Sequence, residues 1–283
     1  MNKKRLIISL LAIITVVAAT VGSYVYRDTI YSRIARTAAV VSGQEIKPLL
    51  DSESRYIRQI VAKDNSTSRT IMWQSDSSEA DAVIEFRVDG SENIQSIGAT
   101  DKVFTDDGST TYIHEGTLTG LTPSTKYEYR VGYGNDRRSD WYSLETAGAS
   151  VYDVLIYPDS QSGDYSGWEQ LVKDSAHRNP RTALYISMGD LVDNGEQDYQ
   201  WRTWLNSIRP LSANVPLATT LGNHEMYTLD WKMREPRAYL NYFDVPPNGN
   251  ETFNRRYYSY DFGDVHYVVL DTMLYESNHE DNH

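Results

Sequence analysis

The chain of 283 residues contains no cysteine. Without a thiol it can form neither a disulfide framework nor a thiolate metal site, and a cysteine nucleophile is excluded as well. Its stability must therefore come from noncovalent packing. At this length one large domain or two modest domains can each bury a hydrophobic core.

Basic side chains are also in short supply. The chain has 27 lysines and arginines and 39 aspartates and glutamates, which gives a formal net charge of -12. A protein that binds nucleic acid by releasing counterions needs the opposite balance, so we expect no stable nucleic-acid partner. Any anionic substrate would need positive charge supplied locally.

The N-terminus combines a basic cluster with a long apolar run. Residues 1–5 carry three basic side chains, and about 21 uncharged residues follow from Leu6 to Tyr26. This run is long enough to cross a bilayer as a helix, with the N-terminus inside the cell. No small-x-small cleavage site follows, so residues 1–27 are predicted to be an uncleaved signal anchor rather than a cleaved signal peptide. The lack of a following cysteine excludes a lipid anchor. We expect residues 28–52 to be a stalk and the remainder to be extracytoplasmic, either anchored to the cell membrane or secreted.

The segment from residue 53 to 148 contains short runs of β-branched and aromatic residues separated by Asp, Asn, Gly and Ser. They are YIRQIVA, RTIMWQS, AVIEFRV, TYIHEGTLTG, KYEYRVGYG and DWYSLETA. Their spacing is typical of an all-β antiparallel sandwich. Moreover, the strings RTIMWQS, IHEGTLTGLTPSTKYEYRVG and SLETA resemble the N-terminal, fibronectin type III-like domain of the purple acid phosphatase family. His114 stands alone among these runs, and we interpret it as structural or solvent-facing.

From residue 149 to 283 strand and helix patterns alternate. Apolar runs occupy residues 151–157, 182–188 and 216–220, and apolar side chains recur at helical spacing in residues 166–179 and 197–208. This alternation is typical of βαβ units with a parallel sheet. Aromatic residues three positions apart on such a helix, here Trp201 and Trp204, are expected in the core rather than in a ligand site.

Polar side chains follow each of the three apolar runs. Asp159 comes after the first run, Asp190 after the second, and Asn223 with His224 after the third. One such loop alone is more often a turn. Three of them at the carboxyl ends of parallel strands, where α/β proteins bind ligands, predict one shared site.

Oxygen and nitrogen ligands suit hard or borderline divalent ions, and the Asp190 carboxylate can bridge two of them. Two ions about 3.5–4 Å apart clamp a phosphoryl group and supply hydroxide near neutral pH, and they invert the local field of an acidic protein.

The strings PDSQ, GDLVDNG and GNHE, in this order, resemble the calcineurin-like metallophosphoesterase domain, an α/β fold in which β-sheets are flanked by helices. With the sandwich before it, the chain is similar to purple acid phosphatases over roughly residues 55 to 275. The resemblance implies two divalent or mixed-valence ions (Fe, Mn or Zn), with Asp159 on the first, Asp190 bridging, and Asn223 on the second. It also implies that His224 lies near the leaving oxygen of the substrate. Glu225 is interpreted as a supporting or helix-starting acid rather than a catalyst.

Three positions depart from the pattern of the family. Asp193 stands where purple members carry a tyrosine bound to ferric iron, so we predict no purple absorption band. It matches instead an aspartate of protein Ser/Thr phosphatases, which implies a hydrogen bond to His224 that keeps a proton ready for the leaving group. Asn194 stands where those enzymes carry a phosphate-binding arginine, and it could donate one neutral hydrogen bond to substrate. Gln161 replaces a metal-binding histidine of many members and either ligates weakly or not at all.

The histidines that family members supply from later strands have no counterpart in this sequence. His279 and His283 lie in the acidic tail ESNHEDNH without a preceding apolar strand, so we do not expect them to substitute. The expectation is therefore a metallophosphoesterase domain that is truncated at the C-terminus, with an incomplete ligand set for each ion.

The leading hypothesis is an extracytoplasmic phosphatase acting on phosphomonoesters. In it, hydroxide on the metal pair attacks phosphorus and His224 protonates the leaving alkoxide. A phosphodiesterase or nucleotidase with the same site is an alternative. A third hypothesis, suggested by the absent histidines, is a non-catalytic surface-anchored binding protein. The expected partners are a phosphate ester and, through residues 1–27, the membrane; the sequence gives no indication of the oligomeric state.

Overall fold

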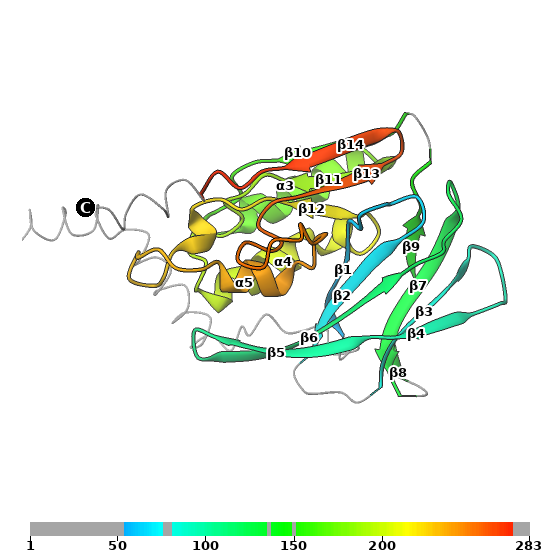
Figure 1. Cartoon of the computed structure of the whole chain (residues 1–283), viewed down its shortest axis with the longest axis horizontal. Helices are drawn as coiled ribbons and strands as arrows, with labels where there is room; N and C mark the ends of the chain where they lie inside the picture. The colour runs from blue at the N-terminus through cyan, green and yellow to red at the C-terminus, as the bar shows by residue number, and fades with distance from the viewer. Residues whose placement is uncertain (1–53, 76–80, 135–136, 149–150, 274–283) are drawn as a thin grey trace, which may run out of the picture. The chain divides into compact units, whose positions relative to one another are not determined.

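The computed structural model describes residues 54–75, 81–134, 137–148 and 151–273 (Figure 1). The predicted signal anchor (1–27) and stalk (28–52) lie outside these residues. Within the described ranges no helix is both long enough and apolar enough to cross a membrane. The membrane segment therefore stays a prediction.

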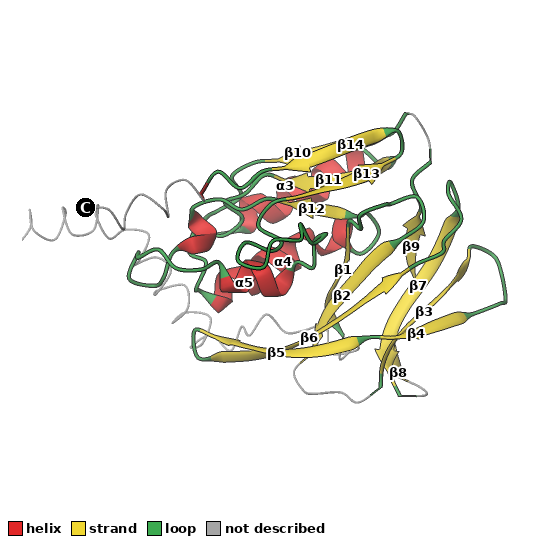
Figure 2. Ribbon diagram, viewed as in Figure 1, coloured by secondary structure: helices red, strands yellow, loops and turns green. Residues whose placement is uncertain are grey.

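The first part of the described chain consists of antiparallel strands (Figure 2). They are β1 (Arg55–Ile60), β2 (Arg69–Ser75), β3 (Ala82–Val88), β4 (Gln95–Gly98), β5 (Thr100–Asp106), β6 (Ser109–Leu118), β7 (Lys126–Tyr133), β8 (Arg137–Arg138) and β9 (Tyr142–Glu145). Strands β4, β3, β7 and β8 form one sheet in this order, and β9 pairs with β7. In β7 the predicted alternation buries Tyr127, Tyr129 and Val131 on one face. The predicted β-rich N-terminal fold is confirmed.

The second part alternates strands and helices. Its elements are β10 (Asp153–Tyr157), α3 (Ser166–Arg178), β11 (Thr182–Ser187), α4 (Asp198–Ser212), β12 (Leu217–Thr219), the 3-10 turn η1 (His224–Met226), α5 (Arg237–Tyr242), β13 (Tyr258–Phe262) and β14 (Val265–Val269). Strands β10, β11 and β12 are parallel neighbours, as the βαβ pattern predicts. β13 and β14 form a separate antiparallel pair.

One sheet contains strands from both parts of the chain. Its order is β10-β11-β12-β1-β2-β6-β5. Strand β1 pairs in parallel with β12 through Ile60 and Leu217, and antiparallel with β2 on its other side. Backbone hydrogen bonds therefore join the two predicted domains (53–148 and 149–283) within one sheet, and their predicted limits stay a prediction.

The burial of β2 follows from its position between two hydrophobic cores. Ile71 and Trp73 belong to the core of the sandwich, whereas Met72 belongs to the core of the α/β part. Because successive side chains point to opposite faces of a strand, every residue of β2 is buried. On α4, Trp201 and Trp204 are 1% and 0% exposed, which confirms their predicted place in the core.

His114 on β6 corrects one detail of the sequence interpretation, because it does not stand alone. Its Nε2 lies 2.7 Å from Ser75 Oγ, and its Nδ1 lies 2.5 Å from Asp101 Oδ1. The ring stacks on Trp73 with centroids 5.2 Å apart. The His114 ring is fully buried between Trp73 and Tyr133, which supports the structural interpretation of His114 and not the solvent-facing one.

Candidate metal centre

The three polar loops begin at the same edge of the sheet. Tyr157 at the end of β10 pairs with Ser187 at the end of β11, and Ser187 in turn pairs with Thr219 at the end of β12. Asp159, Asp190 and Asn223 follow these three residues at distances of a few positions along the chain. The register of the parallel strands therefore brings the predicted metal ligands to one edge.

Hydrogen bonds tie the three loops together around Asp190. The backbone carbonyl of Asp190 accepts the N–H of Gln161 at 2.9 Å, which joins the first loop to the second. Its carboxylate Oδ1 accepts the backbone N–H of His224 at 3.1 Å, which joins the second loop to the third. The loops after β11 and β12 approach each other closely here, since a Cβ at Gly222 would lie 2.0 Å from the same Asp190 oxygen.

Two of the candidate ligands have an uncommon backbone conformation. Asp159 has a φ of 44° and Asp190 a φ of 48°. Residues other than glycine rarely adopt this left-handed region, at a cost on the order of 1–3 kcal/mol, and such residues cluster at functional sites. This strain is retained only where the surrounding structure holds it in place.

Glu225 is the most buried acid of the region, with an exposed fraction of 0%. Its carboxylate accepts four backbone N–H groups, from Asp190, Leu191, Val192 and Gly222. Burial raises the pKa of Glu225 to about 7; the negative charge of Asp190 adds to this rise, and the backbone N–H donors lower the pKa without offsetting the loss of water. The sequence indicated a supporting acid here, but its four partners could not be read from the chain.

The oxygen donors fit a hard or borderline cation. Asp159 and Asp190 offer carboxylates, and the amide nitrogen of Asn223 donates to Tyr227 Oη at 3.2 Å, so that its side-chain oxygen is the atom available to an ion. Gln161 Oε1 is buried and has no hydrogen-bond donor among the described residues. A buried acceptor without a donor is costly, and a metal ion would satisfy it.

The ligand set in the described part of the chain is nevertheless limited. No group of three or more His, Asp or Glu side chains arranged to hold a metal ion occurs within residues 54–273, excluding the gaps given above. The predicted ligands on the three loops amount to two carboxylates (Asp159 and Asp190) and two side-chain amide oxygens (Gln161 and Asn223).

His224 is oriented by the backbone of the second loop. Its Nδ1 lies 2.7 Å from the carbonyl oxygen of Asp193 and 3.6 Å from the Asp193 carboxylate. The structure brings the two residues together as the sequence predicts, but the hydrogen-bond acceptor is the carbonyl oxygen instead of the carboxylate. Gln200 on α4 holds this loop in place, because its Oε1 accepts the backbone N–H groups of Asp193 and Asn194.

Asn194 has a role that differs from the predicted contact with substrate. The residue is 4% exposed, and its amide nitrogen donates to Thr228 O at 2.6 Å. Its Oδ1 accepts the backbone N–H of Glu196. The amide nitrogen thus holds the loop to the chain that follows η1, and the amide oxygen closes a turn within the loop itself, so a bond to substrate would compete with one of these bonds.

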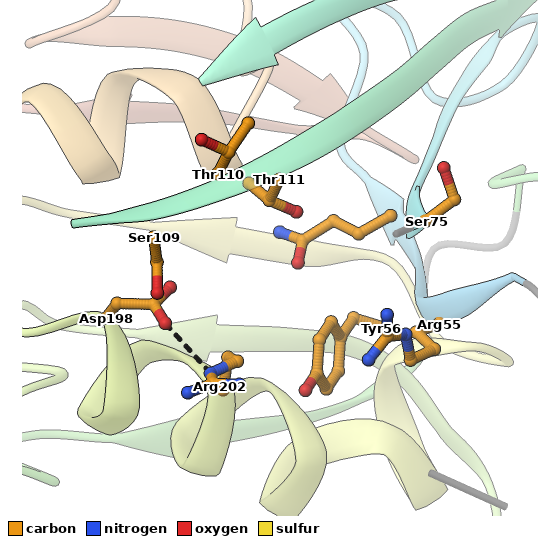
Figure 3. A pocket seen from close by; sticks show the side chains of 9 residues that line it. Arg55, Tyr56, Ser75, Ser109, Thr110, Thr111, Asp198 and Arg202 are labelled. Carbon is orange, nitrogen blue, oxygen red and sulfur yellow. Dashed lines mark ion pairs between the residues drawn. The ribbon is translucent and has the colours of Figure 1, made fainter. Parts of the chain in front are cut away.

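A separate polar cavity lies beside α4 (Figure 3). It is lined by Arg55, Tyr56, Gln74, Ser75, Ser109, Thr110, Thr111, Asp198 and Arg202. Its volume of about 60 Å³ is roughly twice the share of one water molecule in the liquid. Asp198 and Arg202 form an ion pair at 2.9 Å within it. None of the candidate metal ligands lines this cavity.

Comparison with known proteins identifies the family. The profile described as "Calcineurin-like phosphoesterase" matches residues 139–281, about half of the chain. The chain belongs to the calcineurin-like phosphoesterase family. A second profile, "Purple acid Phosphatase, N-terminal domain", matches residues 56–146. The resemblance found in the sequence is thereby confirmed.

Relatives of this phosphoesterase are found in plants and animals. Purple acid phosphatase 13 of Arabidopsis thaliana is 32% identical over 60% of this chain and 38% of its own length. Purple acid phosphatase 23 of the same plant is 26% identical, over 59% of this chain and 42% of its own length. Acid phosphatase type 7 of Homo sapiens is 27% identical over 61% of this chain and 37% of its own length. The phosphoesterase chain thus spans about two fifths of the length of these relatives.

A solved structure has the same fold. The purple acid phosphatase PPD1 from yellow lupin (Lupinus luteus) seeds superposes with a TM-score of 0.65 at 22% identity, over 77% of this chain and 44% of the lupin chain. The likeness supports both the sheet-rich N-terminal part and the α/β phosphoesterase part.

Proposed function

We propose that this phosphoesterase hydrolyses phosphomonoesters at a centre of two metal ions, drawn from Fe, Mn and Zn. Asp159 and Asn223 would each hold one ion, and Asp190 would bridge them. The observation that carries the proposal is the convergence of these residues at three neighbouring strand ends, joined through Asp190. The names of the relatives, which are acid phosphatases, support the choice of monoesters.

The chain's own residues would orient the substrate and move protons. When bound, a pair of ions polarises the phosphoryl group and lowers the pKa of water. Because the Asp193 carbonyl accepts the Nδ1–H of His224, Nε2 is the ring atom that can deliver a proton to the leaving oxygen. The rings of Tyr227 and Trp231 contact the imidazole edge-on and restrict its exposure to water.

The proposed location is outside the cytoplasm, either on the membrane or secreted. The support is the basic cluster and the uncharged run from Leu6 to Tyr26. A fusion of residues 1–60 to a reporter enzyme that is active only outside the cytoplasm tests it. An inactive reporter would contradict the proposed location.

Metal analysis together with two ester substrates tests the proposed function. The purified chain is incubated with Mn²⁺, Zn²⁺ or Fe, its bound metal is measured by mass spectrometry, and it is assayed on p-nitrophenyl phosphate and bis(p-nitrophenyl) phosphate. We expect about two ions per chain and faster cleavage of the monoester. Asn223→Ala should lose metal and activity, whereas Asn241→Ala on α5, whose amide bonds only to its own helix, should retain both.

The other outcomes favour the alternative functions. Preferential cleavage of the diester would indicate a phosphodiesterase or nucleotidase. Absence of bound metal and of activity in the wild-type chain would support a non-catalytic binding protein.

A further inference from the structure

The carboxylate of Glu225 connects two of the loops that carry candidate metal ligands. Its Oε2 accepts the backbone N–H of Asp190 at 3.0 Å and that of Gly222 at 2.8 Å. Its Oε1 accepts the N–H groups of Leu191 at 2.7 Å and Val192 at 3.3 Å. One side chain therefore binds three consecutive amides of the loop after β11 and one amide of the loop after β12.

The contacts of Glu225 are those of a backbone clamp and not of an ion pair. Its side chain is fully buried, and no lysine, arginine or histidine of the described residues forms a salt bridge with it. A buried carboxylate is costly unless hydrogen bonds satisfy it, and here backbone donors supply all of the bonds. An apolar residue would fill the same space but leave four amides without an acceptor.

Two of the amides bound by Glu225, those of Asp190 and Gly222, belong to the residues that set the distance between the candidate metal ligands Asp190 and Asn223. Asp190 is the proposed bridging ligand and has a strained φ of 48°. Gly222 directly precedes Asn223, the proposed ligand of the second ion. The third link, from His224 N–H to Asp190 Oδ1, joins the same two loops. If the Glu225 bonds were lost, Asp190 could relax towards an ordinary conformation and move relative to Asn223.

We propose that Glu225 is a positioning residue that holds Asp190 and Asn223 at the separation required to bind the metal pair, an inference that rests on the proposed function. It touches neither substrate nor ion and acts through the backbone of the two ligand loops. Outer residues that orient ligands in this way typically change metal affinity by about 10- to 100-fold when they are replaced.

The test uses Glu225→Gln, since the amide nitrogen replaces one acceptor oxygen with a donor that faces two N–H groups. Glu225→Asp keeps the charge but is one methylene shorter, and it serves as a second variant should the glutamine protein fail to fold. Glu196→Gln is the matched control, because the Glu196 carboxylate also accepts a backbone N–H, that of Leu229 at 2.7 Å, which is not one of the four amides bound by Glu225.

Two measurements are made on each full-length variant. Amide hydrogen exchange of residues 190–192 and 222 in the metal-free protein should be faster in the Glu225 variants and unchanged in Glu196→Gln. Titration calorimetry with Mn²⁺ or Zn²⁺ should show affinity lower by about 10- to 100-fold in the Glu225 variants, with the far-UV spectrum retained. In the same variants kcat should fall more than KM rises.

The possible failures are distinguishable. Unchanged exchange, or wild-type metal affinity in both Glu225 variants, would overturn the positioning role. If the wild-type chain itself bound no metal, the proposed function would fail, and with it the part of this inference that concerns metal; the exchange data would still decide whether Glu225 clamps the loops.

Discussion

At the scale of single residues, the hydrogen bonds and ring contacts of His224 fix the orientation of its imidazole. One ring nitrogen bonds to the Asp193 carbonyl, and the ring edge lies against Tyr227 and Trp231. A carbonyl oxygen can only accept, so Nδ1 carries a hydrogen and Nε2 is the ring nitrogen that the proposed function assigns to the leaving group. The acceptor belongs to the backbone and is therefore preserved when the Asp193 side chain is replaced.

Replacement of His224 by asparagine should slow hydrolysis of esters whose leaving group must be protonated. We expect kcat for an alkyl phosphate to fall by about 10²- to 10⁴-fold, the usual contribution of a general acid. The loss should be much smaller for p-nitrophenyl phosphate, whose leaving group needs no proton. Steady-state kinetics on both substrates measures the difference, and equal losses on both would show that His224 does not protonate the leaving oxygen.

The variant Asp193→Asn distinguishes the role of the Asp193 backbone carbonyl from that of the Asp193 carboxylate. Because the bond from His224 Nδ1 goes to the backbone, this variant should lose less than about tenfold on the alkyl phosphate, well below the loss of a general acid. A loss as large as that of His224→Asn would show that the carboxylate, 3.6 Å away, is the group that matters.

At the scale of elements, the close approach of two loops depends on glycine. The loops after β11 and β12 meet where Gly222 faces Asp190, and a Cβ would lie 2.6 Å from the Asp190 nitrogen as well as 2.0 Å from its carboxylate. Both neighbours are fixed, the nitrogen by the bond to Glu225 and the oxygen by the bond from His224. Neither can yield without loss of a hydrogen bond.

Gly222→Ala should therefore destabilise the chain and weaken metal binding together. Overpacking of this kind costs about 1–3 kcal/mol of unfolding free energy. Gly167→Ala in α3 is the control, since its new methyl group meets nothing within 4 Å; its stability should be unchanged or rise by up to about 1 kcal/mol. Urea unfolding and metal titration measure both effects. Wild-type metal affinity in Gly222→Ala would mean that the two loops can separate without cost to the centre.

At the scale of the whole molecule, the described chain combines two well-filled cores with an exposed apolar surface near β14. Val268 is 63% exposed and Leu270 is 68% exposed. Tyr152 donates to or accepts from Tyr267, and it packs on Phe262, so this strand pair lies beside the start of β10. Exposed apolar side chains at and just beyond the end of a strand favour association between molecules.

The 283-residue chain should therefore self-associate through this surface. The double substitution Val268→Lys with Leu270→Lys should lower the apparent mass in light scattering at high protein concentration. Val103→Lys is the matched control, because Val103 is equally exposed at 63% but lies on β5, and it should have little effect. If the double variant associated as the wild type does, the contact would lie elsewhere.

The sequence by itself determined the type of most of the strands and of the two long helices α3 and α4, and it determined the residues at the strand ends that carry the candidate ligands. Periodicities of two and of about 3.6 residues specify strands and helices locally, which is why β10, β11, α3 and α4 could be located and why Asp159, Asp190 and Asn223 could be named. Three things were decided only by tertiary structure: the pairing of β1 with β12, the Asp193 carbonyl as partner of His224, and the four amides bound by Glu225. Each of them involves a backbone group, and all but the bond from Gly222 to Glu225 join segments far apart in the chain. Every residue carries the same N–H and C=O, so no side-chain pattern can indicate which of them will meet.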